Sequence, residues 1–265
     1  MPYIRRRVYV ADRIEERRYR CTRTGRGIPR SKNKGTTPAD VEIINENNAR
    51  ETLRLLIDHN FGAGDMHLTE TYQGDQPTLE EAKKNLGGFI RRLRAYYRSI
   101  GEELKYIATT EYRGHRIHHH LIINTPKQGA NLKKLGKLWG HGRPYITPLD
   151  DSGDYHSLGE YLIKEQLIEV DGRCPGKRWS QSRNLKKPKV EKEIIKRGDI
   201  MKEPREIVKV KGATYQLKDY KPWYSDRLGC EVLDAVYVRI GLPAQKCGRG
   251  QTKQKSLCVR SPTME

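Results

Sequence analysis

Three consecutive histidines, His118, His119 and His120, stand inside an apolar run that extends from Ile117 to Ile123. Because such a run predicts a β-strand, and alternate side chains of a strand point to opposite faces, His118 and His120 project together while His119 turns away. Two imidazoles held side by side on a rigid strand are suitable ligands for a divalent cation. The first chemistry that the sequence suggests is therefore metal-dependent. The alternative is that these histidines are ordinary surface or hydrogen-bonded residues without a metal.

A carboxylate is expected beside the two histidines. Residues 104–111 form a second run rich in strand-forming residues, and residues 114–115 suit a two-residue hairpin turn. In that register Glu111 stands opposite His118, and directly opposed residues of antiparallel strands share a face. One oxygen and two nitrogen ligands would then come from Glu111, His118 and His120, with open positions for a substrate. A slip of one residue would send Glu111 to the other face.

A nucleophile is available on a helix expected at residues 157–167. Tyr161 and Lys164 are three residues apart and would share a face of that helix. A phenolate brought to a metal-bound phosphate can attack phosphorus and divide one difficult step into two easier ones. The pKa of an unperturbed tyrosine is about 10, so Lys164 would have to favour the deprotonated form by its charge. On this pair alone, the favoured interpretation is that Tyr161 is an ordinary residue of an amphipathic helix.

The net charge of the chain indicates its partner. The 265 residues include 52 Lys and Arg against 33 Asp and Glu, a formal net charge of +19. This excess favours a polyanion, and the 15 tyrosines suit single-stranded nucleic acid, because bases stack on rings while phosphates meet the charges. No apolar run approaches the ~18 residues of a membrane span. A membrane surface, or no polyanion at all, is the less favoured alternative.

Two further observations narrow the class of protein. The cysteines are odd in number and never form a C-x-x-C pair, which indicates a reducing compartment and argues against a disulfide framework or a zinc ribbon. They are Cys21, Cys174, Cys230, Cys247 and Cys258. No G-x-x-x-x-G-K-[ST] motif occurs, so we expect no ATP-driven helicase domain and dependence on a host helicase.

The elements that must position these residues are a mixture of helices and strands. Besides the hairpin, strands are expected at 67–72 and 144–149 and within 207–240, and helices at 39–58, 78–100, 131–139 and 157–167. Two capping boxes, Thr78 with Glu81 and Ser157 with Glu160, predict where two of the helices begin. Because the hairpin requires antiparallel pairing, we expect an α+β fold with a central antiparallel β-sheet and packed helices.

The order of these motifs resembles that of the HUH endonucleases, the initiator proteins of rolling-circle replication. The stretch NFGAGDMHLTETY precedes the long helix, and RIHHHLIIN, YLIKE and WSQSRNLKKP follow in the order of the family. Within that superfamily the chain looks most like the single-tyrosine replication initiators of small bacterial plasmids, filamentous phages and related integrative elements. The resemblance covers roughly residues 58 to 190, and it implies a ferredoxin-like or RRM-like core.

What the resemblance implies can be assigned residue by residue. His118 and His120 would be metal ligands and Glu111 the third ligand, for Mg²⁺ or Mn²⁺. Tyr161 would be the nucleophile, assisted by Lys164. The reaction would nick single-stranded DNA through a 5′-phosphotyrosine intermediate and leave a 3′-hydroxyl as primer.

Three residues depart from the pattern of the family. His119 stands where a bulky apolar residue is usual, so it could compete as a ligand. Glu70 interrupts a strand that is usually more apolar. Tyr155 is a second tyrosine that could be the nucleophile, although the spacing to Lys164 favours Tyr161.

The expected partner is single-stranded or hairpin origin DNA in the cytoplasm of a bacterial host, with host helicase and polymerase as further partners and no membrane. The basic residues expected to contact DNA are Arg91, Arg92, Arg113, Arg116, Lys177, Arg178, Arg183, Lys186 and Lys187. A relaxase or transposase of the same chemistry is one alternative, and a non-catalytic nucleic-acid-binding regulator is another.

The chain divides into four expected segments. Residues 1–57 form a basic N-terminal arm and helix, and residues 58–190 form the catalytic core. A basic extension with strands follows at 191–243. The polar tail at 244–265 has little to pack and is expected to be disordered.

Overall fold

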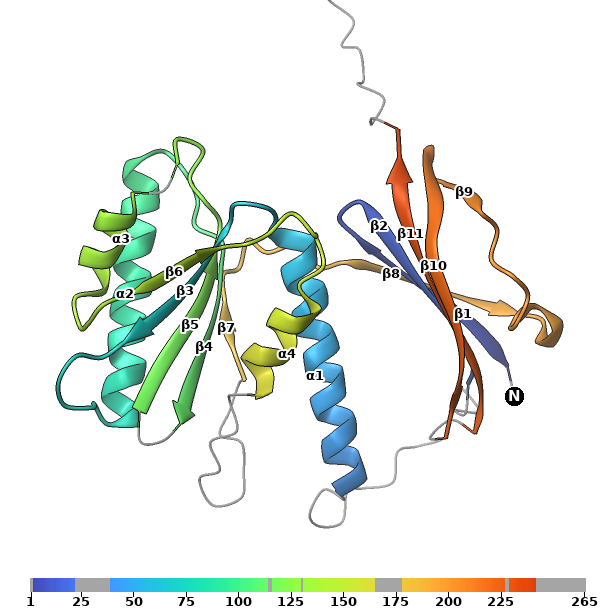
Figure 1. Cartoon of the computed structure of the whole chain (residues 1–265), viewed down its shortest axis with the longest axis horizontal. Coiled ribbons are helices and arrows are strands. Elements are labelled where there is room, and N and C mark those ends of the chain that lie inside the picture. Colours follow the sequence, from blue (N-terminus) through green and yellow to red (C-terminus); the bar gives the residue numbers. More distant parts are fainter. Residues whose placement is uncertain are drawn as a thin grey trace, which may run out of the picture.

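The structure is a computed structural model that describes residues 2–21, 39–113, 116–129, 131–164, 178–226 and 229–241. In these residues the chain forms two antiparallel β-sheets, and helices pack on both faces of one of them (Figure 1). The predicted α+β fold, with a central antiparallel sheet and packed helices, is confirmed. None of the described helices is both long and apolar enough to cross a membrane.

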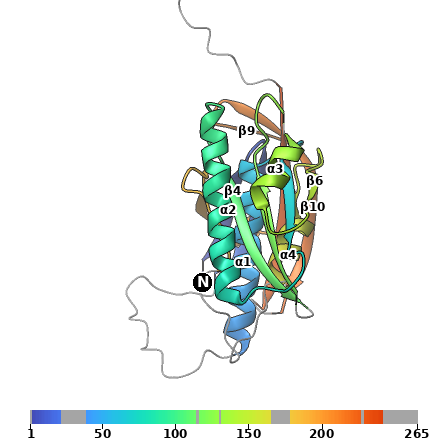
Figure 2. The ribbon, with the colours of Figure 1, turned by 90° about the vertical axis from the view of Figure 1, so that its left-hand side faces the viewer.

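The five-stranded sheet has the predicted histidine strand at its centre. In spatial order its strands are β6 (Tyr145–Pro148), β3 (Met66–Thr71), β5 (Arg116–Ile123), β4 (Tyr106–Arg113) and β7 (Ser180–Gln181). The helices around it are α1 (Ala39–Asn60), α2 (Leu79–Ser99), α3 (Leu132–Trp139) and α4 (His156–Lys164). Helices α2 and α3 cover one face, and α1 and α4 lie on the other (Figures 1 and 2).

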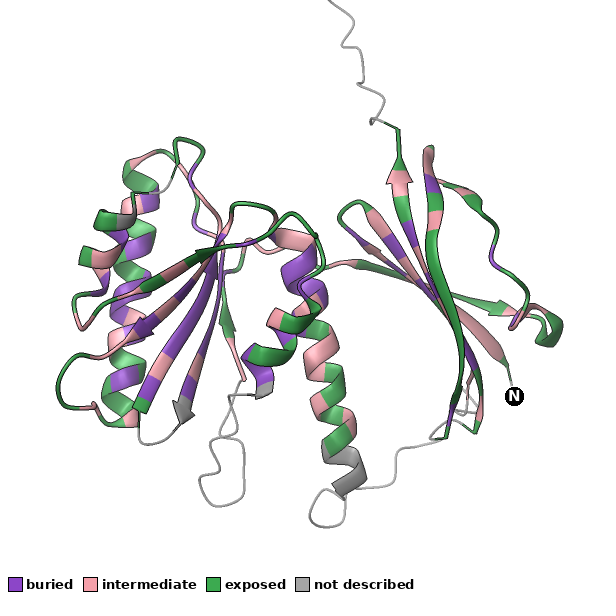
Figure 3. Ribbon diagram, viewed as in Figure 1, coloured by how far each residue is buried: buried purple, intermediate pink, exposed green. Residues whose placement is uncertain are grey.

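Each face of this sheet has its own apolar core, because β5 is covered on both sides (Figure 3). Leu121 belongs to a buried cluster with Phe89 of α2. The next residue, Ile122, belongs to a separate buried cluster with Ile57 of α1 and Leu162 of α4. Alternate residues of one strand thus fill two different cores, which explains why the run reads as continuously apolar around the histidines.

Helix α2 begins at the predicted capping box. The hydroxyl of Thr78 accepts a hydrogen bond from the backbone N–H of Glu81 at 3.3 Å, and the Glu81 carboxylate accepts one from the backbone N–H of Thr78 at 2.8 Å. The apolar residues Ala82, Leu86 and Phe89 follow at helical spacing and are buried. Both the start of this helix and its core-facing side are therefore readable from local sequence.

The second predicted capping box is wrong. Helix α4 begins at His156, so Ser157 lies inside its first turn instead of ahead of it. The backbone N–H of Tyr155, just before the helix, donates to the carboxylate of Asp58 in α1 at 2.9 Å. Glu160 lies 3.4 Å from the imidazole of His156 one turn away. A local carboxylate, that of Asp154, accepts the backbone N–H of His156 at 3.2 Å, so the helix start is held by Asp154 and by Asp58 from a distant helix.

Residues from both ends of the chain form the six-stranded sheet. In spatial order its strands are β8 (Lys189–Ile195), β1 (Tyr3–Val10), β2 (Arg13–Arg20), β11 (Cys230–Ile240), β10 (Ala213–Ser225) and β9 (Ile207–Val210); a 3₁₀ turn, η1 (Arg197–Asp199), precedes β9. Because β1 pairs with β8 and β2 with β11, residues 3–20 and 189–240 share one sheet. The segment boundaries expected from the sequence stay a prediction, and the tail at 244–265 lies outside the described residues.

The arginines of the N-terminal segment form ion pairs. Arg5 lies opposite Glu193 and donates to it at 2.7 Å. Arg17 lies opposite Asp234 and donates two hydrogen bonds to it, of 2.6 and 2.9 Å. Ion pairs of the same kind hold Arg6, Arg7, Arg13 and Arg18. Much of the positive charge of this segment is therefore neutralised by acidic partners within the structure.

Glu70 is buried on the α2 side of β3, directly opposite His119. Neither of its carboxylate oxygens has a hydrogen-bond partner among the described residues. Burial raises the pKa of Glu70 to about 8, because the charged form has lost its water without gaining a partner. Glu70, which interrupts an otherwise apolar face, is thus accommodated in the core at neutral pH because its carboxyl group is protonated.

Glu70→Gln is expected to stabilise the protein, and more so as the pH rises. Below about pH 4 both folded and unfolded chains keep the proton; between there and pH 8 only the folded chain keeps it. The free energy of unfolding of the wild type therefore falls as the pH rises through this window, by a total on the order of 3 kcal/mol at pH 7, and the glutamine variant lacks this loss. Urea denaturation at pH 5 and pH 8 measures the difference. The exposed Glu231→Gln is the control, and equal pH dependence in the wild type and the Glu70 variant would contradict the assignment.

Candidate functional site

The hairpin of β4 and β5 has the register that the sequence predicts. Glu111 pairs with His118, and Arg113 with Arg116. On the other side of β5, Thr69 of β3 pairs with His120. The face that carries these side chains is the one covered by α1 and α4. The two turn residues themselves lie outside the described residues.

His120 is the centre of the polar contacts on this face. Its Nε2 atom lies 3.0 Å from Oε2 of Glu111. Its Nδ1 atom lies 3.2 Å from Nε2 of His67 and 3.2 Å from Oγ1 of Thr69. The rings of His67 and His120 are stacked with centroids 5.3 Å apart. Burial, followed by the neighbouring His120, lowers the pKa of His67 to about 4, so this imidazole is neutral at pH 7.

Sequence reasoning missed His67. His67 stands two residues before Thr69 on β3, so the two side chains project from the same face of the strand. Thr69 pairs with His120, and His67 therefore lies on the face of the histidine cluster. The signal was present in HLTETY, where alternate residues are polar, but it becomes readable only when β3 is known to pair with β5. Local alternation shows that His67 and Thr69 share a face without showing what that face meets.

The donor types on this face suit a hard divalent cation, since Glu111, His118 and His120 combine a carboxylate with two imidazoles. Among the described residues, no three His, Cys, Asp or Glu side chains converge as a finished metal site. Both ring nitrogens of His120 are instead engaged in hydrogen bonds. An ion would have to replace the Glu111–His120 hydrogen bond, and the roles of the three residues as ligands stay a prediction.

Tyr161 lies beside this cluster, whereas Tyr155 does not. The ring centroid of Tyr161 is 5.3 Å from that of His120, with the planes at 82°, and the residue is 40% exposed. Tyr155 is buried, its hydroxyl donates to the carbonyl of Asp150 at 2.8 Å, and burial raises its pKa. Of the two tyrosines, Tyr161 therefore has the accessible phenol next to the histidines. The side chain of Lys164 lies outside the described part of α4.

His119 lies on the opposite face of the sheet. Its Nε2 atom is 2.9 Å from the hydroxyl of Tyr72, and its Nδ1 atom is 3.0 Å from Oγ1 of Thr110. Burial lowers its pKa to about 3, with smaller contributions from the neighbouring histidines. Because His119 projects from the face of β5 opposite to that of His118 and His120, it cannot complete a ligand set with them.

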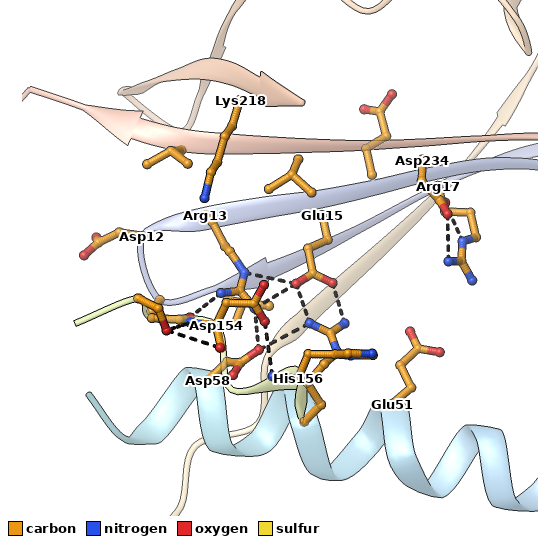
Figure 4. A pocket seen from close by; sticks show the side chains of 18 of the residues that line it. Asp12, Arg13, Glu15, Arg17, Glu51, Asp58, Asp154, His156, Lys218 and Asp234 are labelled. Atoms are coloured by element: carbon orange, nitrogen blue, oxygen red, sulfur yellow. Dashed lines mark hydrogen bonds and ion pairs between the residues drawn. The ribbon is translucent and has the colours of Figure 1, made fainter. Parts of the chain in front are cut away.

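A buried network of ion pairs holds the start of α4 (Figure 4). The carboxylate of Asp58 in α1 contacts Arg13 of β2 and Arg54 of α1, and it accepts the backbone N–H of Tyr155 at 2.9 Å. Arg13 also donates to the backbone carbonyl of Gly153. Burial raises the pKa of Asp58 although two guanidinium groups act in the opposite direction. One residue of the six-stranded sheet therefore fixes the loop that leads into the helix of Tyr161.

Close packing fixes the middle of the same helix. A Cβ atom at Gly159 would lie 3.2 Å from both Cα and Cβ of Arg54, so a larger residue would require α1 and α4 to move apart by a few tenths of an ångström. Gly159 precedes Tyr161 by two residues. The position of the tyrosine beside His120 thus depends on one contact at the helix start and one in its second turn.

The same ion pairs line one end of a cleft of about 710 Å³ between α1 and the six-stranded sheet. Figure 4 shows acidic and basic side chains from both walls meeting there. Glu15 accepts hydrogen bonds from Arg54 at 2.7 and 2.8 Å and from Arg13 at 3.0 Å. The arginines of this cleft are largely occupied by carboxylates, which does not suit a phosphate-binding groove.

The basic residues expected to contact DNA do not gather on one surface. Arg91 and Arg92 lie on α2, which covers the sheet face opposite to that of Tyr161. Arg92 donates to the backbone carbonyls of Leu138 and Trp139 at 2.7 and 3.0 Å, so it joins α2 to α3. DNA contacts by these two arginines stay a prediction, and the structure separates them from the histidine cluster by the thickness of the sheet.

The remaining expected contacts divide between the sheet edge and the hairpin. Arg116 begins β5, is exposed and shares the face of His118 and His120. Residues around β7, at the edge next to β4, supply Arg178, Arg183, Lys186 and Lys187. Lys177 and the side chain of Arg113 lie outside the described residues.

Comparison with known proteins finds a match that covers the middle of the chain. The family model of the replication-associated protein ORF2/G2P matches residues 65–166. This stretch runs from the start of β3 to the end of α4 and includes Glu111, His118, His120 and Tyr161. No curated protein and no solved structure matches the chain. The matched segment therefore associates this site with DNA replication.

Asp58→Ala is expected to lower the free energy of unfolding by about 3 kcal/mol, because two partly buried guanidinium groups lose one of their two carboxylate partners and the buried backbone N–H of Tyr155 loses its acceptor. Chemical denaturation measures the loss. Asp12→Ala is the matched control, since its ion pair with Arg239 is 3.8 Å long and exposed, and such pairs contribute ~0–1 kcal/mol. Equal losses in the two variants would contradict a structural role for the network.

Proposed function

We propose that the protein initiates rolling-circle replication by nicking and rejoining a single strand of origin DNA through a tyrosine nucleophile. The observation that carries this proposal is the exposed phenol of Tyr161 beside His120, on the sheet face that also holds Glu111 and His118. The match of residues 65–166 to a replication-associated family supports the same process.

The chemistry of the proposed step balances within the DNA strand and the tyrosine. The phenolic oxygen of Tyr161 loses its proton and attacks the scissile phosphorus. The bond from phosphorus to the 3′ oxygen breaks, and that oxygen takes up a proton to become the 3′-hydroxyl that primes synthesis. The 5′-phosphotyrosine keeps the energy of the phosphodiester bond, so a later 3′-hydroxyl can reverse the step without ATP.

The polar contacts of His120 give each residue of the cluster a role. Glu111, His118 and His120 would hold Mg²⁺ or Mn²⁺, which when bound would neutralise charge on the scissile phosphate. The hydrogen bonds between Nδ1 of His120 and the side chains of His67 and Thr69 orient the ring of His120 so that its Nε2 points toward Glu111. The neutral His67 adds no positive charge that would oppose an ion.

Tyr161→Phe is expected to abolish covalent attachment to DNA, and Tyr155→Phe to keep most of it, because Tyr161 is 40% exposed beside His120, whereas Tyr155 is buried and its hydroxyl donates to Asp150. Labelled single strands that together cover the replication origin of the DNA that encodes the protein would be incubated with each variant and Mn²⁺, then run on a denaturing gel. An adduct lost only in Tyr155→Phe would move the nucleophile to that residue. Tight binding without an adduct on any strand would favour a non-catalytic regulator.

Removal of the ion is expected to stop the reaction without releasing the DNA. With EDTA the adduct should disappear while most strand binding persists, because phosphate contacts by Lys and Arg do not need the metal. Glu111→Gln and His118→Ala should each weaken Mn²⁺ binding in calorimetry by about tenfold or more. His156→Ala, an exposed histidine at the start of α4, is the control. Undiminished adduct in EDTA would exclude metal dependence.

A further inference from the structure

An aromatic ring lies exposed on the edge strand β6, and an exposed cation lies just before this strand. Tyr145 of β6 is 71% exposed, the second highest value among the exposed large hydrophobic residues of the described chain, and Arg143 is exposed two residues earlier. Ile146 packs against the core on the α2 side of the sheet. Because side chains alternate along an extended chain, Tyr145 projects from the other face, which is the face of the cluster.

The register places Tyr145 in the same cross-strand row as His120. Tyr145 pairs with Thr69, and Thr69 pairs with His120. The hydroxyl of Thr69 reaches Nδ1 of His120 at 3.2 Å, which confirms that this row faces the cluster. Two strand spacings, roughly 10 Å, therefore separate the backbone of Tyr145 from that of His120.

Arg143 belongs to the neighbouring row. Its backbone carbonyl accepts a hydrogen bond from the hydroxyl of Thr71 at 3.1 Å. Thr71 in turn pairs with His118. The chain just before β6 thus follows β3 at the level of the second histidine.

Neither the ring of Tyr145 nor the guanidinium of Arg143 has a hydrogen bond or an ion pair within the described part of the chain. This differs from the arginines of β1 and β2, whose guanidinium groups are held by carboxylates. Arg116 is a further exposed cation on this face, at the start of β5. The surface beside the cluster therefore combines an unoccupied aromatic ring with positive charge.

We propose that Tyr145 and Arg143 form a nucleotide subsite that holds the single strand next to the scissile phosphate, with a base stacked on the ring and a phosphate on the guanidinium. The proposal rests on the proposed function, since it supplies the strand that Tyr161 attacks. An exposed ring fits an unpaired base, whose face is free to stack, and the charge fits its phosphate. In a duplex the base faces are already stacked on each other, so the subsite selects single strands.

The test measures binding in a Tyr161→Phe background, where no covalent adduct forms. The probe is a fluorescein-labelled single strand of about 20 thymidylates, longer than the ~4–16 nucleotides that one single-strand-binding fold covers. The same strand annealed to its complement is the duplex probe. Anisotropy gives the dissociation constant over a range of salt concentrations.

Tyr145→Ala should weaken single-strand binding about five- to 150-fold, the effect of losing one stacked base, and Tyr145→Phe should restore it. Arg143→Gln should weaken binding and reduce the salt slope by about 0.7, the value of one phosphate contact. Tyr224→Ala, which removes another exposed ring (60% exposed) from β10 of the other sheet, should leave affinity near that of the parent. Duplex affinity should change little in any of them.

Equal affinities of the Tyr145→Ala and Tyr224→Ala variants would overturn the subsite, and so would equal weakening on single strand and duplex. Failure of the parent protein to bind the single strand would also overturn it. The proposed function is judged separately, by the covalent adduct. If the wild type forms an adduct and Tyr145→Ala binds the single strand with unchanged affinity, the subsite is wrong and the nuclease stands. If Tyr145→Ala selectively loses affinity for the single strand and the wild type forms no adduct, the subsite stands and the nuclease is wrong.

Discussion

The pairing of β5 with a neighbour on each side is the constraint on which the site depends. Glu111 from β4 and Thr69 from β3 reach His118 and His120 only in the observed register. A slip of one residue in either ladder would place these groups on opposite faces and would also move Leu121 and Ile122 out of their separate cores. The two apolar cores therefore fix the geometry of the polar cluster, because the energetic penalty for exposing their residues opposes any slip.

A second constraint joins the two sheets through charge. Asp58 receives Arg13 from the six-stranded sheet and the backbone N–H of Tyr155 from the start of α4, so residues remote in sequence determine where Tyr161 lies. The cost of burying these charges is offset only while every member of the network keeps its partner. The N-terminal hairpin is thus part of what positions the helix of Tyr161, and its arginines serve mainly to hold structure together.

Local patterns predicted much of the fold around the site. The hairpin register followed from the length of one turn, and the start of α2 from Thr78 and Glu81. The six-stranded sheet did not follow, because its pairings join residues as far apart as Tyr3 and Ile195, and alternation within one strand does not identify a distant partner. The predicted start of α4 was also wrong, because the helix begins at His156, whose N–H is accepted by the nearby Asp154, while Asp58 of another helix accepts the N–H of Tyr155. His67 was missed because its role depends on a pairing between strands that are distant in sequence.

The distribution of charge in the folded chain changes what the net charge of +19 means. Arg5 and Arg17 are neutralised by acidic partners on neighbouring strands, and Arg92 is committed to carbonyls between α2 and α3. Arg116 lies exposed on the face of the histidine cluster and Arg143 lies exposed just before β6, and neither has such a partner among the described residues. A phosphate gains most from a cation that does not have to give up a carboxylate first. Binding strength near the site is therefore expected to depend on these few available cations and on the ring of Tyr145 more than on the total charge.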